Sequence, residues 1–135
     1  MNGSRVLTST QGLTVTSISA YVGAIDASPN NQFSLSIYSD ASGAPSALVA
    51  QSAVGTLKAS SWNTLAISAR LNPNTAHWLF YNTNATRSSL NNLRYSTDPG
   101  LVGAYAPRPF GTWPSTYGTA TLVATRYSLY VTGSP

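Results

Sequence analysis

The chain has 135 residues, 42% of them hydrophobic, which is enough for one folded domain with a single core. Only 7% of the residues are charged, and the Lys and Arg residues behind the net charge of +4 are scattered along the sequence. A nucleic-acid partner is not expected, because a surface that tracks phosphates needs clustered cations. A membrane partner is not expected either, because no apolar run reaches the roughly 20 residues of a membrane span.

The remaining composition is typical of strands and turns. Ser, Thr, Asn and Gly stand where Lys and Glu are usual, Cys is absent, and no window keeps a helical periodicity. Short alternating runs follow one another at intervals of about 8–12 residues with turn residues between them. We therefore predict an all-β fold, an antiparallel β-sandwich of the jelly-roll type, formed by residues 1–135 as a single module.

The first half of the chain contains four expected strands, at residues 5–8, 13–23, 32–39 and 48–54. The alternation is most regular in the third of them. It places Phe33, Leu35 and Ile37 toward the core and Ser34, Ser36 and Tyr38 toward the outside. A turn that contains Asp40 separates this strand from the next.

The second half contains the most apolar segment, residues 74–84, entered from a turn at Pro73. Trp78 and Phe80 share one face of this expected strand and Leu79 and Tyr81 the other, so large groups on both faces predict a strand covered on both sides. Further strands are expected at 62–68, 93–96 and 120–131, the last being the longest, and the loop 101–117 is expected to be irregular.

The sequence offers little for catalysis. Glycoside hydrolysis normally needs two carboxylates, and Asp26, Asp40 and Asp98 all lie in turn-like segments, where Asp bonds to nearby backbone. His77 is the only histidine, which is too few for zinc, and its position within a strand does not suggest a catalytic triad. We therefore predict no catalytic residue, no enzyme and no cofactor, with one alternative: Asp40 and the carbonyls of its turn could hold a structural Ca²⁺.

Two surfaces are candidates for ligand binding. Aromatic rings pack on the apolar face of a sugar, while amides, hydroxyls and Arg bind its hydroxyl groups. The first surface is the proline-rich loop 105–117, which carries Tyr105, Arg108, Phe110, Trp113 and Tyr117. Its prolines restrict the backbone, so that a presented ring loses less entropy on binding. The alternative for Phe110 and Trp113 is that they plug one end of the sandwich.

The second surface is an outward face expected to be shared by Tyr21, Tyr38 and Tyr130, each set among small serines. Rings above a low polar floor would form a groove for a linear chain. The alternatives are ordinary cross-strand aromatic pairing or cover by a neighbouring domain. Trp62, at the start of a strand, is compatible with either the core or the surface.

Four segments carry a resemblance to a known class of modules: residues 14–23, 35–50, 62–65 and 75–79. Together they resemble the jelly-roll modules that are appended to secreted bacterial polysaccharide-degrading and surface proteins, and the resemblance extends from about residue 12 onward. It implies a non-catalytic accessory domain, plausibly a carbohydrate-binding module. It also implies that the chain is secreted and belongs to a larger multidomain polypeptide.

The expected ligand is a polysaccharide, specifically a neutral plant cell-wall β-glucan such as cellulose, xyloglucan or mixed-linkage glucan. An acidic glycan would call for a basic cluster, which this sequence lacks. The alternative function is a structural or adhesive sandwich, as in a surface, phage-tail or linker module without a sugar ligand. A small hydrolase with an unrecognised site is a third hypothesis.

Overall fold

The computed structural model describes all 135 residues and contains only β-strands and their connections. The strands are β1 (Asn2–Leu7), β2 (Leu13–Val22), β3 (Gln32–Ala41), β4 (Ala44–Gln51), β5 (Gly55–Thr56), β6 (Ser61–Leu71), β7 (Ala76–Thr83), β8 (Tyr95–Thr97), β9 (Gly103–Tyr105), β10 (Thr121–Val123), β11 (Thr125–Tyr127) and β12 (Leu129–Ser134). Every strand pairing is antiparallel. No helix suited to crossing a membrane is present.

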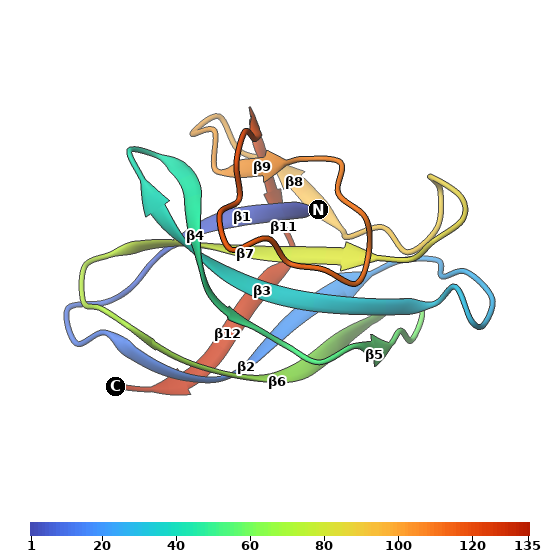
Figure 1. Cartoon of the computed structure of the whole chain (residues 1–135), viewed down its shortest axis with the longest axis horizontal. Coiled ribbons are helices and arrows are strands. Elements are labelled where there is room, and N and C mark those ends of the chain that lie inside the picture. Colours follow the sequence, from blue (N-terminus) through green and yellow to red (C-terminus); the bar gives the residue numbers. More distant parts are fainter.

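Two main sheets face each other (Figure 1). The larger sheet has the order β10-β9-β1-β7-β3-β4, with β5 also paired to β3, and the smaller one has the order β12-β2-β6. A third, two-stranded sheet joins β11 to β8. The apolar residues between the main sheets form a core that includes Phe33, Leu35 and Ile37 from β3 and Ile18 from β2. The prediction of an all-β antiparallel sandwich is confirmed.

Strand β7 lies inside the larger sheet, between β1 and β3, and both of its faces are covered. Leu79 and Tyr81 contribute to the core between the sheets. Trp78 and Phe80 point the other way, into a second apolar cluster on the outer side of the larger sheet. The prediction that this strand is covered on both sides is confirmed, and the two clusters account for its large side chains on both faces.

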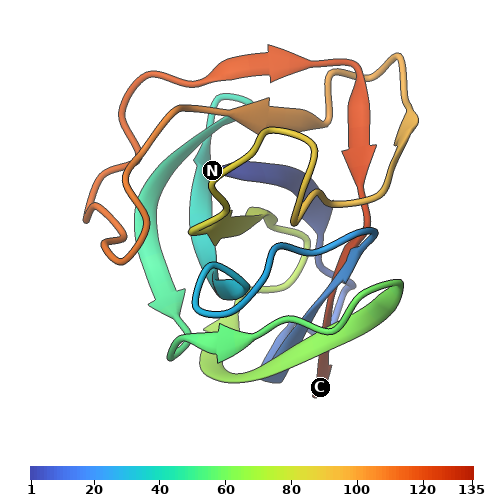
Figure 2. The same cartoon turned by 90° about the vertical axis from the view of Figure 1, so that its right-hand side faces the viewer.

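The second cluster exists because a long connection crosses the outer side of the larger sheet. We call residues 106–120 the covering segment. Figure 2 shows it as the orange chain outside the curved sheet. Its Ala106, Trp113 and Tyr117 are buried against Tyr38, Trp78 and Phe80. Backbone hydrogen bonds hold it along β4, from Leu48 N to Ser115 O at 2.9 Å and from Tyr117 N to Ser46 O at 2.7 Å.

Two expectations about local structure are wrong, and one strand departs from regular alternation. Ser34, Ser36 and Tyr38 are buried rather than outward-facing, because the covering segment lies over them. Residues 120–131 form three short strands instead of one, because β10, β11 and β12 each pair with a different sheet. Val15 is buried together with Ile18, although an unbroken strand would place them on opposite faces. A register shift between Val15 and Ser17 changes the facing.

Candidate functional site

Two rings of the first predicted binding surface lie inside the protein. Trp113 is only 9% exposed and Tyr117 is fully buried, so neither can meet a ligand from outside. Trp113 donates its Nε1–H to Ser34 Oγ at 3.1 Å, and Tyr117 stacks on Phe80 with ring centroids 4.3 Å apart. The expectation that these two rings are presented to a ligand is therefore corrected. They cover the outer side of the larger sheet, so Trp113 is structural as its alternative held, but it does not plug an end of the sandwich.

Tyr38, expected on the second surface, belongs to the same buried cluster. Its hydroxyl donates a hydrogen bond to Pro114 O at 2.6 Å, and its ring meets the edge of Tyr117 at 5.2 Å between centroids. Burial raises the pKa of Tyr38 to about 12, so the phenol stays protonated and keeps this bond. Tyr38 is not on an outward face with Tyr21 and Tyr130, because it belongs to the larger sheet and they belong to the smaller one.

The remaining residues of the first surface do not form a cluster. Tyr105 is exposed on β9, with no other aromatic ring packed against it. Phe110 is half-buried, and Arg108 donates a hydrogen bond to Tyr117 O at 2.9 Å. The cation of Arg108 therefore helps to close the covering segment. The loop predicted as the main binding surface is mostly a structural cover.

Three aromatic rings do lie together on the open face of the smaller sheet, and we call them the ring trio: Tyr21 of β2, Trp62 of β6 and Tyr130 of β12. Trp62 is edge-to-face with Tyr21 at 5.5 Å and with Tyr130 at 4.8 Å between centroids. Trp62 is 49% exposed and Tyr130 44%, while Tyr21 is half-buried. The sandwich core lies on the opposite side of this sheet, so the outer sides of these rings face solvent.

Small residues position the trio. β2 lies between β6 and β12, so the Trp62 ring has to cross β2 to reach Tyr130. Ser19, at the crossing, has a side chain short enough to lie beneath the rings, and it is 1% exposed although it points away from the core. Its hydroxyl shares a hydrogen bond with Thr64 Oγ1 at 2.7 Å. The trio therefore stands on a hydroxyl-bearing floor.

The polar atoms of the trio differ in their availability. Tyr21 donates its hydroxyl to Ser60 O at 3.0 Å, which fixes its ring against the turn before β6. The indole N–H of Trp62 and the hydroxyl of Tyr130 form no hydrogen bond within the chain, so both can bond to a ligand. The charge near the trio is small. Arg70 already donates to Thr14 Oγ1 at 3.0 Å and to Gln11 O at 3.2 Å, and Lys58 lies beside Trp62 as a single cation.

Asp40, the predicted calcium ligand, is surrounded by donors. Its Oδ1 accepts hydrogen bonds from Arg5 Nε and Trp78 Nε1, both at 2.8 Å, and its Oδ2 accepts one from the Gly43 amide at 3.1 Å. Burial acts to raise the pKa of Asp40, but the bonds from Arg5, Gly43 and Trp78 outweigh it and hold the pKa below its ordinary value. These contacts link β1, β3 and β7, and they give the calcium prediction no support.

The other candidate catalytic groups also have local partners. Asp26 accepts hydrogen bonds from the Thr86 amide and hydroxyl, at 2.9 and 2.7 Å, and Asp98 pairs with Arg126 at 2.9 Å. His77 is buried, and its Nδ1 lies 3.2 Å from Thr75 O. Within the chain, no three His, Cys, Asp or Glu side chains gather in a group that could hold a metal ion.

No protein family, curated protein or solved structure that was compared with this chain matches it. Sequence reasoning found Tyr21 and Tyr130 but left Trp62 between core and surface. Its position directly opposite Tyr21 in the β2–β6 register is what brings it into the trio, and that register cannot be read from one strand in isolation.

Proposed function

We propose that this protein is a non-catalytic carbohydrate-binding module for neutral β-glucans and that it binds them on the ring trio. The observation that carries the proposal is the contiguous set of Tyr21, Trp62 and Tyr130 on an open sheet face. A pyranose ring presents an apolar face that packs on such side chains, while its hydroxyl groups need donors and acceptors nearby.

The form of this surface favours an extended chain over a compact ligand. The trio lies on the outer face of β12-β2-β6, which continues past the rings along a series of short side chains: Ser17, Thr64, Ala66 and Ser68. A linear glycan can lie along such a face without meeting a wall. The rings already pack against each other, so that binding fixes few additional rotamers.

The charge of the surface favours a neutral ligand. An acidic polysaccharide would require a cluster of unpaired cations beside the rings, whereas Arg70 is already bonded to Thr14 and Gln11 and Lys58 is a single charge beside Trp62. With three rings as the main contact, the affinity should be modest, with Kd between about micromolar and millimolar.

The absence of catalysis is proposed from the carboxylates. Glycoside hydrolysis needs an acid and a base or nucleophile that face one substrate across about 5–10 Å. Asp26, Asp40 and Asp98 each accept hydrogen bonds from their own turns or from an Arg, and their pKa values lie below the ordinary range. A general acid needs the opposite shift, toward neutral pH.

Native gel electrophoresis through soluble xyloglucan or mixed-linkage β-glucan, with a pull-down on cellulose, tests the proposal. The wild-type chain should be retarded by at least one neutral β-glucan, and Trp62→Ala should lose about tenfold or more in affinity. Tyr105→Ala is the matched control, because Tyr105 is an exposed ring outside the trio, and it should behave as wild type.

Two results would contradict the proposal: no retardation by any neutral β-glucan, or equal retardation of Trp62→Ala and wild type. Size-exclusion chromatography then decides about the alternative function. The alternative holds if the chain binds no glycan but self-associates, and if Trp62→Ala abolishes that association. The ring trio is then a protein contact of a structural or adhesive domain.

A further inference from the structure

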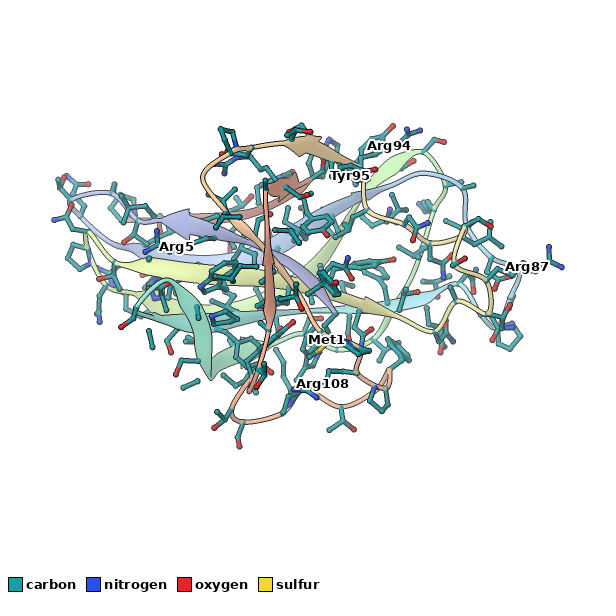
Figure 3. The ribbon with its side chains drawn as sticks, turned by 90° about the horizontal axis from the view of Figure 1, so that it is seen from above. Met1, Arg5, Arg87, Arg94, Tyr95 and Arg108 are labelled. Carbon is teal, nitrogen blue, oxygen red and sulfur yellow. The ribbon has the colours of Figure 1, made fainter.

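A pocket of about 430 Å³ lies between the larger sheet and the two-stranded sheet, away from the ring trio. It forms where β1, β7, β8 and β11 converge. β11 is held against β1 by a hydrogen bond from the Tyr127 amide to Ser4 Oγ at 2.8 Å. Figure 3 shows Tyr95, at the start of β8, on the opposite side of the molecule from Arg108 of the covering segment. No residue of the ring trio or of the covering segment lines the pocket, so it is distinct from both.

The pocket has a closed floor and an accessible rim. Tyr81, Asn91 and Leu93 line its floor and are each at most 6% exposed. Tyr95 stands at the rim with 69% of its surface exposed, and its ring meets the edge of Tyr127 at 6.2 Å between centroids. A small ligand can therefore enter past Tyr95 and pack on an aromatic wall. The volume falls within the usual range for small-molecule pockets.

The polar groups that remain free in the pocket are both donors and acceptors. Asn2 donates its amide to Tyr127 Oη at 3.2 Å, which leaves Asn2 Oδ1 as an acceptor and the Tyr127 hydroxyl hydrogen as a donor. Asn92 donates to Ser88 O at 2.8 Å, which leaves its Oδ1 free. The Thr125 hydroxyl also lines the pocket and forms no bond within the chain.

No charged side chain lines this pocket. An ionic ligand would lose its hydration without gaining a counter-charge, which is costly in a partly enclosed site. An apolar ligand would leave the amides and hydroxyls without partners. A neutral molecule with several hydroxyl groups and one apolar face satisfies both conditions, because its hydroxyls can donate and accept and its apolar face can pack on Tyr95 and Tyr127.

From this chemistry we infer that the pocket is a second binding site, which takes a single small neutral saccharide, either free or as the end of a chain. Asn2, Asn92, Thr125 and Tyr127 bind its hydroxyl groups, and the Tyr95 ring covers its apolar face. The ring trio is open at both ends and suits the interior of a polymer, whereas this pocket is closed at its floor and suits a terminus. The inference does not depend on the ring trio binding a glycan.

Nuclear magnetic resonance titration of the ¹⁵N-labelled full chain tests this site directly. Glucose, mannose, galactose and cellobiose are the probes, each added separately. At least one should give saturable shifts in the side-chain amide signals of Asn2 and Asn92, with Kd in the millimolar range expected for so small a ligand, roughly 1 mM. Tyr95→Ala and the isosteric Thr125→Val should each weaken binding about tenfold or more.

Trp62→Ala serves as the control and should leave these shifts unchanged, so that failure here is distinguishable from failure at the ring trio. The inference is overturned if none of the four saccharides moves the Asn2 and Asn92 amides, or if the shifts persist undiminished in Tyr95→Ala. Because Tyr95 is largely exposed, that variant should fold, and an unchanged backbone spectrum verifies this.

Discussion

The indole Nε1–H of Trp113 donates a hydrogen bond to Ser34 Oγ across 3.1 Å, which bonds the covering segment to the middle of the larger sheet. The bond joins residues 79 positions apart, and it explains why a polar residue occupies a buried position of β3. The ring centroid of Trp113 also lies 6.3 Å from that of Tyr38. The covering segment is therefore packed as a third layer of the fold.

Trp113→Ala should destabilise the protein by about 3 kcal/mol or more, because it leaves a cavity over Tyr38 and an unpaired hydroxyl on Ser34. Trp113→Phe keeps most of the packing and loses the hydrogen bond, so it should cost about 1 kcal/mol. Urea unfolding followed by fluorescence measures both. Glycan binding in Trp113→Phe should equal that of wild type. A loss of binding without a loss of stability would show instead that Trp113 contacts the ligand.

Trp62→Ala should show the reverse behaviour: a loss of glycan binding with only a small loss of stability. The two edge-to-face ring contacts of Trp62 are each worth about 0.5–1.5 kcal/mol, or about 1–3 kcal/mol together. Because Trp62 is half-exposed, the free energy of unfolding should fall by an amount near the lower end, about 1–2 kcal/mol. The same urea series measures this change. A loss as large as that of Trp113→Ala would mean that the trio is chiefly structural.

Gly3→Ala should disrupt the pairing of β1 with β7. Gly3 lies opposite Phe80, and a Cβ at residue 3 would collide with the Phe80 ring and with the carbonyl oxygen of Leu79. The backbone oxygen cannot move without breaking the sheet, so we expect a loss of about 2 kcal/mol or more. Gly43→Ala offers a comparison, because a Cβ there meets no atom within 4 Å and its cost is limited to a positive φ of 86°. Thermal unfolding of both variants measures the difference.

Asp40→Ala should cost more stability than Arg5→Ala. Removing the carboxylate leaves the Nε1–H of the buried Trp78 without its acceptor, which costs about 1–3 kcal/mol. Removing Arg5 breaks an ion pair whose cation is 41% exposed, and such pairs contribute at most about 1 kcal/mol. Thermal unfolding with and without Ca²⁺ compares the two variants. A calcium-dependent rise in Tm that disappears in Asp40→Ala would instead establish the metal site.

Stability should fall in two steps as the pH decreases. Burial lowers the pKa of His77 in the folded chain. Below the ordinary value of about 6.5, the unfolded chain therefore binds a proton that the folded chain does not yet bind, and stability decreases. The pKa values of Asp26, Asp40 and Asp98 are also lowered, so their contribution is present above about pH 4 and is lost as the pH falls further. Tm measured from pH 7 to 2 should show both steps. Burial also lowers the pKa of the Met1 amino group to about 6, so this group contributes to the first step. His77→Gln should therefore weaken the first step, and an unchanged first step would rule out His77 as one of its causes.

The sequence predicted those features that depend on a single strand. The large residues at 78–81 could only belong to a strand with both faces covered, and Phe33, Leu35 and Ile37 could only face a core. The covering segment was not predicted, because Ser34 and Ser36 beside Tyr38 are typical of a solvated face. Their small size in fact leaves room for the rings above them.

The candidate site could be predicted only in part, for a related reason. Tyr21 and Tyr130 can be recognised in the sequence as large rings among serines. Trp62 lies beside them only because of the register of β6 on β2. Asn2 and Thr125 are 123 positions apart, and neither has a sequence context that suggests binding. Such pairings depend on how the strands cross between sheets, which local patterns do not contain.

The position of β1 in the larger sheet has a consequence for biosynthesis. Asn2 pairs with Tyr81 on one side and with Tyr105 on the other, so both neighbours of β1 come much later in the chain. Because synthesis proceeds from β1 toward β12, β1 has no partner until β7 has been made, and its other edge stays unpaired until Tyr105 follows. During that interval the nascent sheet has unpaired backbone groups, and Trp78 and Phe80 stay exposed until the covering segment has been made, a condition that favours aggregation of β-proteins.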